Sequence, residues 1–201
     1  YLFTPDVNEN IGSIQPKWIA GINNSFRYKD FTFSFLIDFK HGGDVFSLDQ
    51  DFGQYDGLYP NTAGLNAKGQ LQRSDVASGG GALLPGVTSK GTPNTVYVAD
   101  NAAGAAYGFG SAPDRQFVYD ASYIKLREAI FSYSIPKKVL ANTKSIKGVQ
   151  VSVVGRNLWI IHKNLPYADP ETGTSFGNVS GFQAGAYPST RDFSVNLKVN
   201  F

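Results

Sequence analysis

The chain has 201 residues, with 18 basic and 16 acidic side chains, and its formal net charge of +2 gives no field that would favour nucleic acid as a partner. It contains no cysteine, which excludes disulfides and thiolate metal sites, and no run approaches the roughly 18 apolar residues of a transmembrane helix. The 14% of aromatic residues, together with 22 glycines and 10 prolines, favour an all-β protein with long loops.

The first predicted element is a β-hairpin in KWIAGINNSFRYKDFTFSFLIDFKHGG, with strands over about 18–28 and 31–40. If Lys29 and Asp30 form a two-residue turn, one face of the hairpin is apolar at every position except Asn24. A slip of one residue would destroy that agreement, so the sequence also predicts the register. The expected pairs are Tyr28 with Phe31, Phe26 with Phe33, Asn24 with Phe35, Ile22 with Ile37 and Ala20 with Phe39.

Two further strands are predicted over about 123–135 and 149–161. In EAIFSYSIP one face is apolar and Pro136 ends the strand, but the preceding YIKLR places Ile124 and Leu126 in the opposite phase. That break indicates either a bulge or the emergence of the strand from a membrane. In VQVSVVGRNLWII, Asn157 falls on the otherwise apolar face, which carries Val149, Val151, Val153, Trp159 and Ile161.

The last predicted strand, over about 192–201, alternates strictly. Its odd positions are apolar and its even positions are polar or charged, which gives one apolar side and one polar side. A soluble sandwich would bury the apolar side in its core, whereas a membrane barrel would turn it toward lipid. The apolar residues are Phe193, Val195, Leu197, Val199 and Phe201.

The connections between these strands alternate in length. Short turns at 29–30 and 136–148 alternate with long segments over about 41–122 and 162–190, as in outer-membrane barrels with periplasmic turns and extracellular loops. With that threading, Trp18 and Trp159 lie at the extracellular ends of their strands. A second aromatic girdle lies near the periplasmic ends and contains Tyr28, Phe31, Tyr133 and Phe201. Because bacterial barrels have at least eight strands, these five need partner strands from upstream.

Four ordered motifs, YDASYIKLREAIFSYSIPKKVL, GRNLWII, ADPE and YPSTRDFSVNLKVNF, closely resemble the C-terminal end of the SusC/RagA-type TonB-dependent outer-membrane transporters of Bacteroidetes. The hairpin and GGGALLPGVTSKGTPNT resemble that family's preceding hairpin and one of its extracellular loops. The resemblance implies that residues 1–201 are the C-terminal part of one barrel domain, contributing about five strands to an antiparallel transmembrane β-barrel of 22. The plug domain would lie upstream of Tyr1, which we expect to be an internal residue because the chain lacks methionine.

The resemblance also implies a function and a set of partners. Such a transporter imports oligosaccharides or oligopeptides, is energised by TonB, and is usually capped by a SusD-like surface lipoprotein. Its final strand, ending at Phe201, is similar to the signal that the barrel-assembly machinery reads, and its wall contacts membrane lipid, the rest of the barrel and the plug. Asp30 stands where the family often has glycine, a departure that aspartate's tolerance of positive φ makes easy to accept.

Two other classes of protein remain as alternatives. A soluble carbohydrate-binding β-sandwich would use exposed aromatic residues such as Tyr55, Tyr59 and Tyr107. A porin or barrel enzyme that works without TonB would share the strand pattern. Cell fractionation separates the first from a transporter, and dependence on TonB separates the second.

Candidate chemical sites are sparse. SLDQDFGQYDG offers Asp49, Asp51 and Asp56 as oxygen ligands for Ca²⁺, but it lacks the full EF-hand pattern, and solvated loop carboxylates are the simpler interpretation. Asp169 and Glu171 of ADPE are two residues apart on a loop, a spacing that says nothing of a catalytic pair. His41 and His162 have no evident third ligand. We therefore expect no catalytic, metal or cofactor site and no enzyme activity.

Overall fold

The computed structural model describes residues 8–100, 113–143, 145–172 and 180–201. Tyr107 and parts of both predicted long loops lie outside these ranges. The chain forms two compact units, and each is described by itself. One unit comprises Tyr1–Gly12, Val45–Val118 and Gly173–Gly185, and the other, here called the sheet unit, comprises Ser13–Asp44, Tyr119–Thr172 and Ala186–Phe201.

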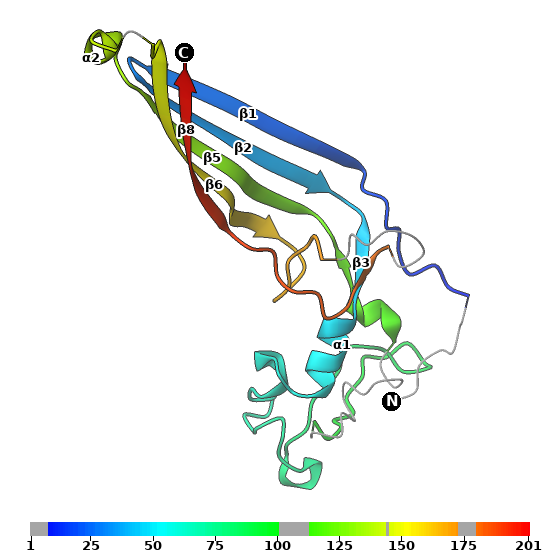
Figure 1. Cartoon of the computed structure of the whole chain (residues 1–201). Coiled ribbons are helices and arrows are strands. Elements are labelled where there is room, and N and C mark those ends of the chain that lie inside the picture. Colours follow the sequence, from blue (N-terminus) through cyan, green and yellow to red (C-terminus); the bar gives the residue numbers. More distant parts are fainter. Residues whose placement is uncertain (1–7, 101–112, 144, 173–179) are drawn as a thin grey trace. The chain divides into compact units, whose positions relative to one another are not determined.

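The sheet unit contains one antiparallel sheet of five strands in the order β1-β2-β5-β6-β8 (Figure 1). The hairpin turn, helix α2 (Lys137–Leu140) and the C-terminus lie at the same end of this sheet (Figure 1). The observed bounds differ from the predicted ones by at most two residues. They are β1 Trp18–Tyr28, β2 Phe31–His41, β5 Tyr123–Ser134, β6 Gly148–Lys163 and β8 Asp192–Asn200.

The hairpin register predicted from the sequence is confirmed. Tyr28 pairs with Phe31, and the pairing continues without a break to Trp18 and His41. The turn differs in one detail, because Lys29 has the positive φ, at 53°, and Asp30 does not. A positive φ at the first central residue alone is the pattern of a type II′ turn, whose twist suits a two-residue hairpin.

The phase break in β5 is a β-bulge at Arg127. Leu126 pairs with Ile37 and Glu128 pairs with Leu36, so Arg127 has no partner of its own in β2. The extra residue returns Leu126 to the face that the following half of the strand makes apolar. Of the two interpretations of YIKLR, the bulge is the one that the structure shows.

Strand β6 is irregular beside this bulge, and the assignment of Asn157 to the apolar face is wrong. Asn157 adopts the left-handed conformation, with φ of 52°, and the register with β5 shifts there. Its side chain donates from Nδ2 to the carbonyl oxygen of Thr190 at 3.0 Å. Trp159, two residues later, pairs with Leu126. The irregularity removes a polar side chain from the apolar face without moving Trp159 away from it.

One face of the sheet is apolar and open to its surroundings. Phe26, Phe131 and Val153 lie on three different strands of this face, and about half of each residue is exposed. Phe31 contacts the ring of Tyr133, with 4.8 Å between ring centroids. In a water-soluble domain such side chains would form the core, but here the sheet has no layer packed over them among the residues described.

The other unit lies mostly within 45–118, which the sequence predicted as a loop. It has short elements, none of them a helix long and apolar enough to cross a membrane in the ranges described. Strand β3 pairs in parallel with β7, and the second sheet has the order β4-β3-β7. The elements, of which β3 and β4 cross the boundaries of this unit, are β3 Asp44–Ser47, α1 Leu48–Tyr55, η1 Pro60–Thr62, η2 Val76–Ser78, η3 Asp114–Phe117, β4 Val118–Asp120 and β7 Phe182–Gln183.

Helix α1 replaces the loop expected around SLDQDFGQYDG. Ser47 caps its N-terminus by accepting a hydrogen bond from the backbone N–H of Gln50 at 3.2 Å. Gly53 lies inside the helix because the ring of Tyr59 packs against it, leaving no space for a Cβ atom. The Tyr59 hydroxyl donates to the carbonyl oxygen of Asp49 at 3.0 Å, which fixes the ring in place.

We therefore predict that Gly53→Ala, made in the longer protein that the sequence predicts (the full-length parent), lowers the local stability of this helix by about 1 to 3 kcal/mol, because a Cβ atom would lie 2.4 Å from the Tyr59 ring. Amide hydrogen exchange over 48–62 measures the effect. Gly64→Ala is the matched control, since its Cβ would meet only ordinary contacts, the nearest being Gln72 Nε2 at 3.7 Å. Equal exchange in the two variants would contradict the packing argument.

Candidate functional site

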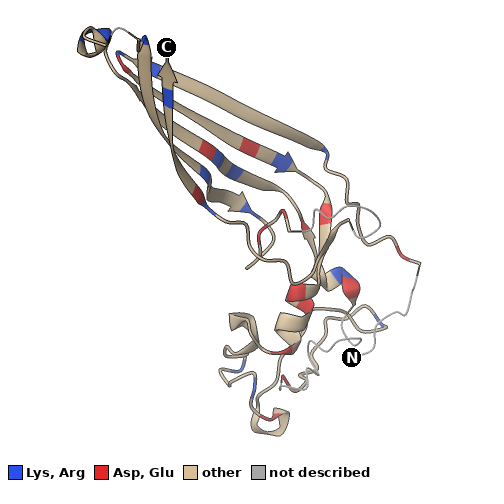
Figure 2. Ribbon diagram, viewed as in Figure 1, with Lys and Arg blue, Asp and Glu red and all other residues tan. Residues whose placement is uncertain are grey.

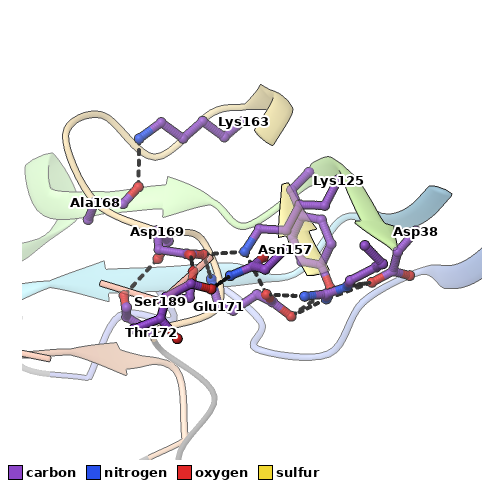
Figure 3. A network of polar contacts seen from close by, with 12 residues as sticks. Asp38, Lys125, Asn157, Lys163, Ala168, Asp169, Glu171, Thr172 and Ser189 are labelled. Carbon is purple, nitrogen blue, oxygen red and sulfur yellow. Dashed lines mark hydrogen bonds and ion pairs between the residues drawn. The ribbon is translucent and has the colours of Figure 1, made fainter. Parts of the chain in front are cut away.

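Charged residues gather along the strands in the half of the sheet away from the hairpin turn (Figure 2). Several of them form a network of ion pairs on the polar face (Figure 3). At its centre is Lys125 of β5, which is fully buried. Its ammonium group binds Asp169 at 2.5 Å and Glu171 at 2.6 Å. A buried ammonium without such partners would be very unfavourable, so these two carboxylates are what allows the lysine to lie there.

Arg127, the bulged residue, joins this cluster to β2. Its Nη2 atom lies 2.7 Å from Oδ2 of Asp38, and its Nε atom lies 2.9 Å from the same oxygen. On its other side it binds both carboxylate oxygens of Glu171. The Tyr123 hydroxyl lies within hydrogen-bonding distance of Asp38 and Glu171, at 3.2 and 3.3 Å. Five charged groups and one phenol are thus satisfied mainly by one another.

The network holds the segment 164–172 against the sheet. Leu165 of this segment is completely buried, and Lys163 donates to the carbonyl oxygen of Ala168 at 2.7 Å. The far end of the same predicted loop also reaches the network, because the Ser189 hydroxyl donates to Asp169 (Figure 3). The acidic pair of ADPE therefore anchors both ends of the connection between β6 and β8.

Both anchoring carboxyl groups are held in the ionised form. Burial opposes ionisation of Asp169, but hydrogen bonds from Lys125 and Ser189 outweigh it and lower the pKa below the usual value. Burial likewise opposes ionisation of Glu171, and hydrogen bonds from Arg127 and Lys125 lower its pKa. Depressed carboxyl pKa values stabilise the docked segment above the usual carboxyl pKa, and this stability is lost as the pH falls through the lowered values.

Beside the network the polar face forms an open hollow of about 590 Å³. Side chains from β2, β5 and β6 line it, and Gly21 of β1 leaves space where any other residue would place a side chain. Arg156 and Glu128 pair across it, with 2.9 Å between Nε and Oε2. The lining residues are Gly21, Leu36, Asp38, Arg127, Glu128, Arg156 and Asn157.

The three candidate calcium ligands are not brought together as a site. Asp49 and Asp51 are two residues apart on α1, so their side chains point about 200° apart around the helix. Asp49 accepts from the backbone N–H of Gly185, and burial raises the pKa of Asp51, with Asp114 adding to the effect. Asp56 is the C-cap of α1. Across the ranges that the structure describes, no three His, Asp or Glu side chains are grouped as metal ligands.

The two histidines are engaged separately. The His41 ring packs against Trp18 with 5.3 Å between centroids, while His162 pairs in the ladder with Ile124. Trp18 begins β1 opposite His41, and Trp159 lies near the end of β6, so both lie at the end of the sheet from which the long segments depart. That these residues form aromatic girdles at two membrane interfaces remains a prediction.

Sequence reasoning missed Asp38, Lys125 and Arg127 as members of one site. The available signal was the pair of basic residues in YIKLR, which coincides with the break of phase. Burial of Lys125, two residues before the bulge, requires an acidic partner from another part of the chain. ADPE supplies that partner, but the 44 residues between Lys125 and Asp169 gave no indication of the contact.

The sequence is similar to those of two curated proteins. The chain is 26% identical over 197 residues to TonB-dependent receptor P3 of Formosa agariphila, and 24% identical over 197 residues to TonB-dependent receptor P26 of the same organism. Each match covers 95% of this chain. The resemblance to TonB-dependent receptors is confirmed. The chain spans only 17% and 18% of the length of these two relatives. No family model matches it.

Solved structures show the same fold. The chain superposes on the RagAB peptide importer in its "closed-closed" state with a TM-score of 0.61, covering all of this chain and 19% of that one. The "open-open" state gives a TM-score of 0.58 and covers 94% of this chain and 17% of that one. Sequence identity is 16% in both cases, so these matches concern the fold. A mostly antiparallel sheet that matches part of such a chain is the expected form of a barrel fragment.

We predict that Asp169→Asn in the full-length parent releases the segment 164–172, because the buried Lys125 ammonium loses one of its two carboxylates. We expect the substitution to lower the stability of the docked segment by about 3 to 5 kcal/mol, as when one partner of a buried ion pair is removed in other proteins. Hydrogen exchange of the backbone amides of Glu171 and Thr172, which bond to Asp169, measures it.

The control for this change is Glu128→Gln, which breaks a more exposed pair with Arg156. Exposed ion pairs contribute about 1 kcal/mol or less, so the segment should keep its protection. Similar exchange in the two variants would show that the Lys125 network does not hold the segment.

Proposed function

We propose that this chain forms the C-terminal part of the barrel wall of a TonB-dependent importer in the outer membrane. The observation that carries the proposal is the division of the five-stranded sheet into an exposed apolar face and a polar face. The strands are 9 to 16 residues long, and a tilted strand needs about 9 to 11 residues to cross a bilayer. An exposed apolar face of this extent requires a covering, and lipid supplies one for all strands at once.

On this proposal the apolar face contacts lipid and the polar face lines the lumen. In β8 the lipid-facing residues are opposite apolar residues of β6, as in Leu197 with Val151. The aromatic residues at the two ends of the strands then lie at the two membrane interfaces. The proposed lipid-facing set of β8 and its C-terminus is Phe193, Val195, Leu197, Val199 and Phe201, and the proposed girdles contain Trp18, Trp159, Tyr28, Phe31, Tyr133 and Phe201.

The proposed topology places 41–122 and 162–190 outside the cell. Strands β1 and β8 are the edges of the sheet, so each needs a neighbour, and further strands of the same polypeptide would close a barrel of 22. The plug, the TonB contact, the SusD-like lipoprotein and the barrel-assembly machinery are proposed partners of the whole protein. The division of the RagAB importer into two named components is consistent with a two-protein assembly.

The proposed solute is a large one, an oligopeptide or an oligosaccharide. The name of the structurally similar RagAB peptide importer favours peptides, and we place them first. No step of this function requires chemical conversion of the solute, so the proposed protein is a transporter and not an enzyme. A cofactor has no role in it.

Cell fractionation and uptake together test this proposal. The full-length parent should appear in the outer-membrane fraction and require detergent, and its deletion should reduce uptake of a labelled peptide digest or of labelled oligosaccharides. Loss of TonB should reduce the same uptake to the same degree. Recovery of the parent from the aqueous fraction would favour a carbohydrate-binding sandwich, and uptake that survives loss of TonB would favour a porin.

The orientation of the faces makes a sharper prediction in the last strand. Leu197→Arg in the full-length parent should reduce barrel stability by about 2 to 4 kcal/mol, because the guanidinium would face lipid near the bilayer midplane. Asn196→Arg is the matched control, since the adjacent side chain faces a wet lumen. Heat-modifiable gel mobility of outer-membrane protein reports the folded fraction. Equal tolerance of the two changes would show that the faces are assigned wrongly.

A further inference from the structure

The hollow on the polar face combines open space with two guanidinium groups in its lining. It lies beside the ion network but is not filled by it, and Gly21 keeps it open. A Cβ atom at Gly21 would make only ordinary contacts, the nearest with Leu36 Cδ1 at 3.7 Å, so packing does not require a glycine there. If the proposed function is correct, the hollow opens into the lumen that the solute crosses.

Two arginines line the hollow, and they differ in how many of their N–H groups are already hydrogen-bonded. Arg127 donates from Nε, Nη1 and Nη2 to Asp38 and Glu171, which hold its side chain in place. Arg156 binds Glu128 through Nε, and its side chain is 67% exposed. The end of the guanidinium that carries Nη1 and Nη2 makes no contact that would occupy it within the described ranges. That end is a planar pair of donors that matches a carboxylate in geometry.

We propose that the hollow binds a carboxylate group of the imported solute and that Arg156 is its main donor. Glu128 has the role of a positioning residue, because its bond to Nε directs the free end of the guanidinium into the hollow. The charge of Arg127 is balanced by Asp38 and Glu171 and that of Arg156 by Glu128, and Asp192 is opposite Arg156 in the ladder. Recognition therefore rests on directed hydrogen bonds and not on a general positive field.

The chemistry of the lining also indicates which solutes suit the hollow. None of its lining residues is aromatic, so it offers no ring on which a neutral sugar could stack. A carboxylate comes either from an acidic peptide or peptide terminus, or from an oligosaccharide that contains uronic acids. This inference rests on the proposed importer function, and the two sources are separate arms of its test.

The test measures binding to the full-length parent in detergent. One arm uses N-acetylated tetrapeptides with a free C-terminal carboxylate and the same peptides as amides, and the other uses oligogalacturonates and their methyl esters. The wild type should bind the acid form of at least one arm about tenfold or more tightly than its neutral counterpart. Arg156→Gln should abolish that preference, and Arg156→Lys should retain part of it.

Two further variants separate recognition from folding. Gly21→Gln should fill the hollow and weaken binding of the acid form, with no change in heat-modifiable mobility. Arg27→Gln is the matched control, because Arg27 lies on the same face of β1 near the turn. Its Nε donates there to the carbonyl oxygen of Lys29, its one hydrogen-bond partner among the described residues, and acid binding should be unchanged.

Three results would overturn the inference. They are no preference for either acid series in the wild type, an equal loss of acid and neutral binding in Arg156→Gln, or a preference that survives that change. An equal loss would indicate that the hollow contacts the plug. TonB-dependent uptake by the wild type, measured separately, distinguishes failure of this inference from failure of the proposed importer function.

Discussion

The structure depends on keeping apolar and polar side chains on opposite faces of one sheet through a region where simple alternation fails. Without a bulge, Ile124 and Leu126 would lie among the charged residues, and Lys125 would lie among the rings of the apolar face. The extra residue at Arg127 shifts the phase of β5, and the left-handed residue Asn157 of β6 lies beside it. Both irregularities lie at the same level of the sheet: β5 changes phase there, whereas Trp159 of β6 stays on the same face as Val153, and the two strands remain paired.

The same irregularity supplies the polar chemistry. A bulge bends its strand and redirects a side chain, and here the redirected side chain is a guanidinium that reaches β2 and the ADPE segment at once. The buried Lys125 beside it then has two carboxylates within 2.6 Å. The bulge, the ion network and the docked segment are therefore one arrangement, and a change in any of them has consequences for the other two.

The parts of this fold that follow from local rules could be predicted from sequence. The hairpin register followed because only one register made nine of ten paired positions apolar, with Asn24 the exception, and the C-terminal strand followed from its alternation. The bulge could be predicted only as one of two alternatives, since a phase break does not say what causes it. Helix α1 was missed because its stability depends on the Ser47 cap and on Tyr59 packing against Gly53, and neither is visible as a hydrophobic period.

The candidate site was predictable to a smaller extent, for a physical reason. Lys125 and Asp169 meet only because two strands and a turn bring them together over 44 residues. Local sequence patterns do not indicate a contact over that distance along the chain. The hollow is still less visible, because it exists where a side chain is missing at Gly21 and where Asn157 departs from strand geometry. Their coincidence beside the exposed guanidinium of Arg156 is the observation from which we propose that this part of the sheet contacts the solute.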